Sequence, residues 1–319
     1  MIEGALRKKI EQNLCHYYQD DKFVVHDIKQ VNTKPGSVVF RVKIYDEKKG
    51  CLDIYAKRYD KKFNANIHEI IGLKESYAQF LMPRIIDYYD EENVVLLEGV
   101  RGRTLSKSLL YYGFSFGMSL NAETLLACSQ KIGHAIGSMQ KLTIRRERKK
   151  IGDLNIYLIK EIESEEYFKV ILGNDFLKDI RSQVDALKGL KTNVAHYHGD
   201  PSPHNIIINE DEVYLLDFSF RINATFLDPV LYLVSLELMR SRFSFSLNAT
   251  VLKMEDVFLH AYTEITNENW CDSTWALFKT LTYLHYLLMY WKRKKTIKRS
   301  IIASIDRRYL LKKIKEYNL

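Results

Sequence analysis

The chain contains 319 residues, of which 46% are apolar or aromatic, and this is enough for one large domain or two lobes with a sizeable core. Its four cysteines form no Cys-x-x-Cys pair, which argues against a zinc cluster or a disulfide framework and favours a reducing compartment, with the cytoplasm as the default. A net charge of +8 is compatible with nucleic acid, an anionic membrane surface or a phosphorylated compound as a partner.

No segment is predicted to enter a membrane. The start of the chain has no continuous apolar run, so we expect no signal peptide. The longest apolar and aromatic run, 281–291, is interrupted by His285 and is shorter than the ~20 residues that a membrane-spanning helix needs. We therefore expect no transmembrane helix.

The first hundred residues are predicted to form a small domain built on an antiparallel sheet. Apolar side chains at helical spacing predict a helix over residues 3–18. Strands rich in Val, Ile, Tyr and Phe, separated by short polar turns, are predicted over residues 23–28, 37–45 and 51–57. A second helix is expected over residues 66–80. A further strand, 94–100, ends in a polar residue followed by glycine.

The next part of the chain is predicted to be helical. Between residues 106 and 191 apolar side chains recur every three or four positions. Two stretches depart from this pattern, the basic cluster 145–150 and the aromatic segment 111–117. Both can line a substrate site, and the plainer interpretation is a solvated turn for the first and a packed loop for the second.

A loop followed by a hairpin is predicted after residue 198. Gly199 and the prolines on either side of Ser202 exclude a helix around Asp200. Two short apolar runs, 206–208 and 213–216, are separated by a polar turn, and this pattern predicts two paired strands.

The ends of this hairpin bring two oxygen ligands together. Asn205 precedes the first strand and Asp217 follows the second, and the two ends of a hairpin are neighbours in space. An amide oxygen and a carboxylate suit Mg²⁺, which takes one or two protein carboxylates and completes its shell with phosphate oxygens and water. Asp200 is then left to orient or deprotonate a hydroxyl group.

The pattern His198-Gly199-Asp200-x-x-x-x-Asn205, followed by Leu216-Asp217-Phe218-Ser219, resembles the catalytic and metal loops of the aminoglycoside phosphotransferase and choline kinase-like family, relatives of the protein kinases. His-Gly-Asp in place of His-Arg-Asp indicates the small-molecule branch. The alternative is an ordinary hairpin with Asp and Asn residues in its turns.

The resemblance implies an α+β, bilobal, protein-kinase-like fold. The small lobe, with its antiparallel sheet, would span residues 1–100, and the larger, mainly helical lobe residues 101–319. It also implies transfer of the γ-phosphate of ATP (or GTP) to a hydroxyl of a small molecule or sugar, with Asp200 as the catalytic residue and with Asn205 and Asp217 as magnesium ligands.

The resemblance implies a phosphate-binding pair in the small lobe. Lys57, at the end of the third strand, would contact the α- and β-phosphates. Glu69, which fits the family's E-x-x-x-L pattern in the following helix, would hold it in place, with Glu75 as the fallback. Arg58 takes the place of Lys57 if the strand register is off by one.

Two further segments correspond to nucleotide-binding parts of the family. Ser37 lies where the phosphate-covering loop is expected, although the stretch contains one glycine and no G-x-G-x-x-G, so a plain hairpin turn also accounts for it. Residues 98–100 correspond to the lobe connection, where backbone groups of Glu98 and Val100 would bind the base. Thr104 is expected to cap the helix that follows.

One position departs from the family. A D-P-x-x-D-L signature normally follows the metal loop, and its second Asp braces the catalytic loop. Here Asp228-Pro229 fits, but Tyr232 stands at the second Asp. This substitution puts the rigidity of the loop in doubt, unless Asp228 takes over part of the bracing.

The sequence does not identify the acceptor. Acceptors in the family include aminoglycosides, choline or ethanolamine, sugars and cell-envelope glycans, and the positive charge mildly favours an anionic one. The competing hypothesis is a kinase-like binding module without catalysis, which holds a partner, a membrane or nucleic acid on a basic surface. Nucleic acid is the less expected partner.

The end of the chain is predicted to be helical, with aromatic stripes. Its basic residues can contact an anionic membrane or a polyanion, or they can form the outer face of a docked terminal helix.

Overall fold

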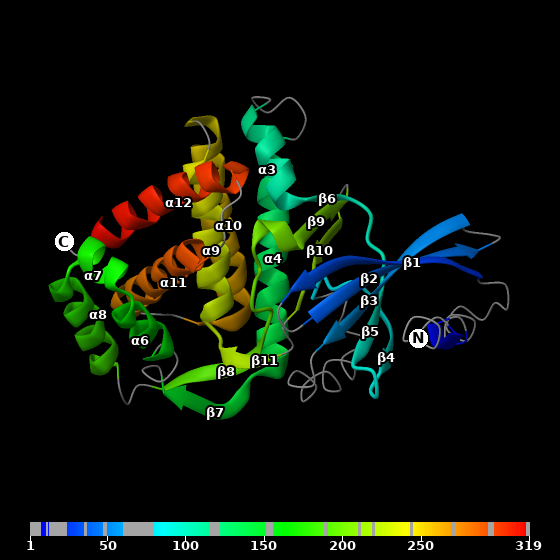
Figure 1. Cartoon of the computed structure of the whole chain (residues 1–319), viewed down its shortest axis with the longest axis horizontal. Coiled ribbons are helices and arrows are strands. Elements are labelled where there is room, and N and C mark those ends of the chain that lie inside the picture. The colour runs from blue at the N-terminus through cyan, green and yellow to red at the C-terminus, as the bar shows by residue number, and fades with distance from the viewer. Residues whose placement is uncertain are drawn as a thin grey trace. The chain divides into compact units, whose positions relative to one another are not determined.

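The chain forms two units, which are described in turn (Figure 1). The first comprises Met1–Gly102 with Tyr214–Leu216, and the second Arg103–Val213 with Asp217–Leu319. The structure is a computed structural model, and it describes residues 8–10, 12, 24–34, 37–46, 50–59, 80–114, 121–150, 156–187, 191–209, 212–218, 221–242, 245–268, 272–292 and 297–316.

The first unit contains a five-stranded antiparallel sheet in the order β1-β2-β3-β5-β4. Its strands are β1 (Val24–Lys34), β2 (Ser37–Asp46), β3 (Gly50–Tyr59), β4 (Ile85–Tyr89) and β5 (Val94–Glu98). The three strands predicted first are confirmed. β1 continues six residues beyond its predicted end, to Lys34, which pairs with Ser37 across a two-residue connection.

One face of this sheet carries the core of the first unit. Val42, Ile44, Ile54 and Ala56 are at most 1% exposed and pack in one cluster with Ile10 of the N-terminal segment. Side chains alternate between the faces of a strand, so the residues between them on β3, including Lys57, lie on the opposite face. The predicted helix over residues 66–80 lies almost entirely outside the described residues.

The second unit is mainly helical. Its helices are α3 (Leu105–Phe114), α4 (Ala122–Thr143), α6 (Ile156–Ser164), α7 (Glu166–Leu172), α8 (Asn174–Ala186), α9 (Leu227–Ser241), α10 (Phe245–Thr266), α11 (Asp272–Lys292) and α12 (Ile297–Glu316). Thr104 caps α3 as predicted, because its Oγ1 accepts the N–H of Lys107 at 3.4 Å. The sheet and helix content confirms the predicted α+β class.

Helices α4 and α10 pack closely, because α4 presents small residues to its neighbour. A Cβ atom at Gly133 would lie 2.6 Å from the carbonyl oxygen of Phe258, and one at Gly137 would lie 3.1 Å from Cβ of Ile265. Glycine at these two positions therefore lets the backbones approach. Figure 1 shows the two helices side by side.

Two small sheets support the loops of this unit. Sheet β10-β9-β6 contains β6 (Arg103–Thr104), β9 (Ile206–Asn209) and β10 (Glu212–Leu215), and sheet β11-β8-β7 contains β7 (Arg145–Lys150), β8 (Lys191–Tyr197) and β11 (Arg221–Ala224). The predicted hairpin after residue 205 is confirmed as β9 and β10.

The basic cluster 145–150 is not the solvated turn that the sequence indicated. It forms strand β7, which pairs antiparallel with β8 and has an irregularity between Arg145 and Arg148. Its sequence does not alternate between apolar and polar residues, so the usual pattern that predicts a strand is absent. Its hydrogen bonds come from β8, and charged residues are common on strands at the edge of a sheet.

The C-terminal helix α12 is docked onto the unit. Leu310 and Ile314 are fully buried in its core. Asp306, also fully buried, accepts two hydrogen bonds from the guanidinium of Arg242, at 2.8 and 2.6 Å. These contacts support the docked-helix interpretation of the basic C-terminus.

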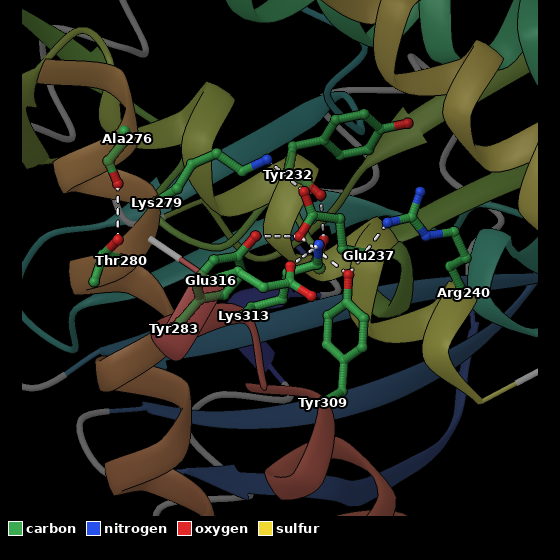
Figure 2. A network of polar contacts seen from close by, with 11 residues as sticks. Tyr232, Glu237, Arg240, Ala276, Lys279, Thr280, Tyr283, Tyr309, Lys313 and Glu316 are labelled. Carbon is green, nitrogen blue, oxygen red and sulfur yellow. Dashed lines mark hydrogen bonds and ion pairs between the residues drawn. The ribbon is translucent and has the colours of Figure 1, made fainter. Parts of the chain in front are cut away.

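A second polar network joins α9, α11 and α12 (Figure 2). The carboxylate of Glu237, 3% exposed, pairs with Lys279 and accepts the hydroxyl hydrogen bond of Tyr283. Tyr309 of α12 donates to the same carboxylate at 3.5 Å and accepts from Arg240 at 3.2 Å.

Among the helices in the described ranges, none has both the length and the apolar character needed to cross a bilayer.

Candidate active site

The candidate catalytic loop connects two paired strands. It leaves the end of β8, and the chain returns through β11, whose first residue, Arg221, pairs with Tyr197 at the end of β8. Between them, residues Pro203–Asn205 form a single 3₁₀ turn, and the N–H of Asn205 donates to the carbonyl of Ser202 at 2.8 Å. The loop is therefore anchored at both ends by one sheet.

The backbone before Asp200 has a conformation that requires glycine. Gly199 has a φ of 91°, in the left-handed region that L-residues rarely adopt. This explains why the motif contains Gly rather than a residue with a side chain.

A buried carboxylate braces this part of the loop. Asp228, in the first turn of α9, accepts the backbone N–H of His198 at 2.7 Å and that of Gly199 at 2.9 Å. The predicted weakness at Tyr232 is therefore not observed, because Asp228 takes the bracing role. Tyr232 itself is fully buried, and its hydroxyl hydrogen-bonds Ser129 at 2.9 Å, so it packs α9 against α4.

Opposing effects act on the pKa of the Asp228 carboxyl. Complete burial raises the pKa of its carboxyl to about 6, although the N–H groups of Gly199 and His198 and the side chain of Gln140 lower it. At neutral pH the carboxylate is thus ionised, which favours both backbone hydrogen bonds. From the sequence, Asp228 was expected to take over only part of the bracing.

The two motifs meet through His198 and Phe218. The imidazole of His198 is fully buried and packs on the ring of Phe218, with centroids 4.3 Å apart. Its Nδ1 accepts the backbone N–H of Asp200 at 3.3 Å, so His198 also orients the residue two positions later. Both residues belong to the two motifs quoted from the sequence, where neither was given a role of its own.

Asp200 and Asn205 are in direct contact. The side-chain nitrogen Nδ2 of Asn205 donates to Oδ2 of Asp200 at 2.8 Å and to its backbone oxygen at 2.9 Å. These bonds fix one oxygen of the Asp200 carboxylate, and the other accepts no hydrogen bond within the described residues. Within the described residues both hydrogen bonds of the Asn205 side chain use Nδ2, which leaves its oxygen available as a ligand.

Asp217 follows the β9–β10 hairpin in an unusual conformation. Its φ of 68° lies in the left-handed region, where a non-glycine residue is strained, and such strain is concentrated at functional sites. Its neighbour Phe218 packs on His198, so Asp217 lies beside the catalytic motif.

The donor set of Asn205 and Asp217 fits Mg²⁺. Among the described residues there is no group of three or more His, Cys, Asp or Glu side chains placed to hold a metal ion. One carboxylate and one amide oxygen match the usual magnesium pattern, in which phosphate and water supply the remaining ligands.

The small sheet places the candidate phosphate-binding residues on one face. Lys57 pairs with Val39 of β2, and Ser37 pairs with Tyr59, so these side chains share the face opposite the core. Lys57 is 5% exposed, and its ammonium lies 4.5 Å from the ring centroid of Tyr59. Arg58 points to the other face, which favours Lys57 as the candidate.

The segment after β5 passes close to β3. A Cβ atom at Gly99 would lie 2.0 Å from the carbonyl oxygen of Asp53, so no other residue fits here without movement. The N–H of Glu98 donates to the carbonyl of Arg84 at 2.9 Å. Val100 makes no backbone hydrogen bond within the described part of the chain. Glu69 and Glu75, the predicted partners of Lys57, lie outside it.

Comparisons with known proteins bear on the fold. No protein-family model matches the sequence, and no curated protein matches it. Solved structures do: a choline kinase from Cryptosporidium parvum Iowa II superposes with a TM-score of 0.59 and 14% identity, over 98% of this chain and 96% of that one.

Two other solved structures give a similar result. An ethanolamine kinase from Plasmodium vivax has a TM-score of 0.52 and 12% identity, over 99% of this chain and 89% of that one. A macrolide 2'-phosphotransferase from Brachybacterium faecium has a TM-score of 0.50 and 10% identity, over 95% of each chain. The chain therefore has the protein-kinase-like fold of these small-molecule kinases and phosphotransferases.

Proposed function

We propose that the protein is a phosphotransferase that moves the γ-phosphate of ATP or GTP to a hydroxyl of a small molecule. The observation that carries the proposal is the contact between Asp200 and Asn205 on a loop braced by Asp228. A hydroxyl-activating carboxylate beside a metal-ligating amide is what phosphoryl transfer requires.

Asp200 has the role of orienting residue and proton acceptor. Its free carboxylate oxygen accepts a hydrogen bond from the acceptor hydroxyl and takes the proton as the hydroxyl oxygen bonds to the γ-phosphorus. The bond from that phosphorus to the bridging oxygen breaks, and the nucleoside diphosphate leaves. Positioning by the protein supplies much of the rate gain, because the two reactants are held in line.

The remaining residues bind and neutralise the nucleotide. Asn205 and Asp217 would hold Mg²⁺, which when bound neutralises charge on the phosphates. Lys57 places an ammonium on the α- and β-phosphates, with Glu69 as its partner, and Ser37 lies on the same sheet face. Backbone groups of Glu98 and Val100 would bind the base.

A transfer assay tests this proposal. Purified protein is incubated with Mg²⁺ and with ATP or GTP labelled at the γ-phosphate. The acceptor panel contains choline, ethanolamine, a macrolide, aminoglycosides, sugars and cell-envelope glycans, with anionic members included. Mass spectrometry then identifies the product. We expect a phosphorylated compound that disappears when Asp200 is replaced by Asn.

The competing function is a binding module that uses basic surface. Strand β7 contains five basic residues among six, and this observation favours a polyanion or an anionic membrane as its partner. Binding that weakens steeply with salt, without a nucleotide-induced thermal shift, would support the module and contradict the phosphotransferase. A cytoplasmic location stays a prediction from the cysteine pattern.

A further inference from the structure

The strand that leads into the candidate catalytic loop loses a backbone partner on one side before it ends. In sheet β11-β8-β7, Arg145 is the first residue of β7, and it pairs with Val194 of β8. Continuing this antiparallel register by two residues brings Thr143, the last residue of α4, opposite His196. Because the chain is still helical at Thr143, the backbone of β7 does not extend to this side of His196.

A side chain takes the place of the strand there. The hydroxyl of Thr143 accepts the backbone N–H of His196 at 3.0 Å. The same hydroxyl donates to the carbonyl of Met139, one turn earlier in α4, at 2.7 Å. Its hydrogen is therefore committed to the helix, and an oxygen lone pair serves the strand. Thr143 is 7% exposed and His196 1%, so water does not compete for the bond between them.

This bond is the first of a series of side-chain contacts that ends at Asp200. Beyond His196, the N–H groups of His198 and Gly199 both donate to Asp228. The N–H of Asp200 then donates to Nδ1 of His198. Side chains thus accept these N–H groups in the place of a neighbouring strand. The position of Asp200 therefore depends on where α4 and α9 hold their acceptors.

The last turn of α4 is itself fixed in place. Gln140, one turn before Thr143, is 1% exposed, and its Oε1 accepts the hydroxyl hydrogen bond of Tyr262 at 2.6 Å. The same hydroxyl of Tyr262, on α10, lies 3.4 Å from the carbonyl oxygen of Thr225, its second acceptor. The turn that carries Thr143 is thus joined to α10 and to the segment before α9, which makes it a rigid support for β8.

We propose that Thr143 is a positioning residue, which holds the entry to the loop so that the carboxylate of Asp200 meets the acceptor hydroxyl. This inference rests on the proposed phosphotransfer and adds a residue of another element on which its rate depends. Small displacements of a reacting group are costly, because the reacting atoms must stay in line. Without the hydroxyl of Thr143, the N–H of His196 would lose this acceptor inside the protein, and the backbone would shift to replace it.

Steady-state kinetics test the role. The acceptor is the panel compound that the wild-type protein phosphorylates fastest. Thr143→Val removes the hydroxyl and keeps the shape, so we expect kcat to fall by about tenfold and the KM for ATP to change by less than about threefold. The ATP contact is spared because Lys57 and Asp217 are placed by other strands. Thr143→Ser keeps the hydroxyl and should restore kcat to within about twofold of the wild type.

Thr282→Val is the matched control. Thr282 is a buried helical threonine, 8% exposed, whose hydroxyl also donates one turn back, to the carbonyl of Phe278 at 2.8 Å. Its kcat should stay within about twofold of the wild type, because α11 holds no part of the loop. Melting temperatures establish that both variants are folded at the assay temperature. A wild-type kcat in Thr143→Val, or an equal loss in Thr282→Val, overturns the inference.

Amide hydrogen exchange tests the support without using turnover. By mass spectrometry we expect residues 194–200 to exchange about tenfold faster in Thr143→Val, because this backbone loses an acceptor that keeps it closed. The same residues should exchange at the wild-type rate in Thr143→Ser and Thr282→Val. Unchanged exchange in Thr143→Val overturns the inference. Absence of any Asp200-dependent transfer is a different result, because it contradicts the proposed function itself, while the exchange comparison still shows whether Thr143 holds the loop.

Discussion

The carboxylate of Asp228 accepts the backbone N–H of His198 at 2.7 Å and thereby ties the first turn of α9 to the end of β8. Because Asp228 is fully buried, water does not compete for this bond. The bond holds the backbone just before Asp200, so the position of the carboxylate that we propose to be catalytic depends on a side chain from another element.

Replacing Asp228 by Asn tests the brace. Asn keeps the shape but has one acceptor oxygen, and its NH₂ faces a backbone N–H, so we expect turnover at pH 7.5 to fall by about 10- to 100-fold. The wild type should lose activity as the pH falls through about 6, because Asp228 then takes up a proton. The activity of the Asn variant should not fall in this way near pH 6, because Asn does not titrate. Asp175→Asn, which alters an exposed carboxylate on α8, serves as control, and full activity in Asp228→Asn contradicts the bracing role.

Two substitutions separate chemistry from metal binding. In Asp200→Asn we expect turnover to drop by about 10²-fold or more, in line with the contribution of a general base, while nucleotide binding survives. In Asp217→Asn we expect Mg²⁺-dependent nucleotide binding to be lost, because a magnesium ligand loses its charge. Turnover is measured with the transfer assay and binding by calorimetry with ATP and Mg²⁺. Normal turnover in Asp200→Asn removes the catalytic assignment.

Adjacent residues on β3 give a matched pair for the phosphate contact. Lys57→Met should raise the KM for ATP by about tenfold, because a cation that faces the nucleotide is removed. Arg58→Met removes the same charge from the opposite face of the sheet and should leave this KM within about twofold. If Arg58→Met has the larger effect, the assignment of Lys57 is wrong.

The stability of the protein should depend on pH through Glu255 on α10. Burial, and then the charge of nearby Glu237, raise the pKa of Glu255 to about 7. Because the folded state binds this proton more tightly than the unfolded state, the stabilisation is complete below the unfolded pKa and is lost as the pH rises to about 7.

Glu255→Gln removes that ionisation. We expect the melting temperature at pH 8 to rise by about 2–4 °C relative to the wild type, and the difference to shrink near pH 5. Calorimetry at both pH values makes the comparison, with Glu264→Gln, an exposed carboxylate on the same helix, as control. A melting temperature of Glu255→Gln below that of the wild type at pH 8 would contradict the conclusion that the buried charge of Glu255 destabilises the fold.

These local elements could be predicted from the sequence because short-range signals determine them. Alternating apolar residues indicated β2 and β3, and turn residues indicated the β9–β10 hairpin, since both depend on the chain's own backbone and on which face meets the core. The contact between Asp200 and Asn205 was not predicted, because the sequence analysis paired Asn205 with Asp217 and left Asp200 to act on a hydroxyl group. The protein-kinase-like fold was implied by the resemblance of these motifs to a known family, and the solved structures confirm it.

Long-range pairing decided the rest. β7 is a strand because β8 offers it a hydrogen-bonding edge, and no pattern in a run of Arg and Lys records that partner. Tyr232 appeared to be a missing brace, yet Asp228, one helical turn earlier, reaches His198 thirty residues away in sequence. The sequence alone indicated which residues of the loop are candidates for its chemistry. Only the tertiary structure decided what holds them, because a buried hydrogen bond depends on how distant segments fold together.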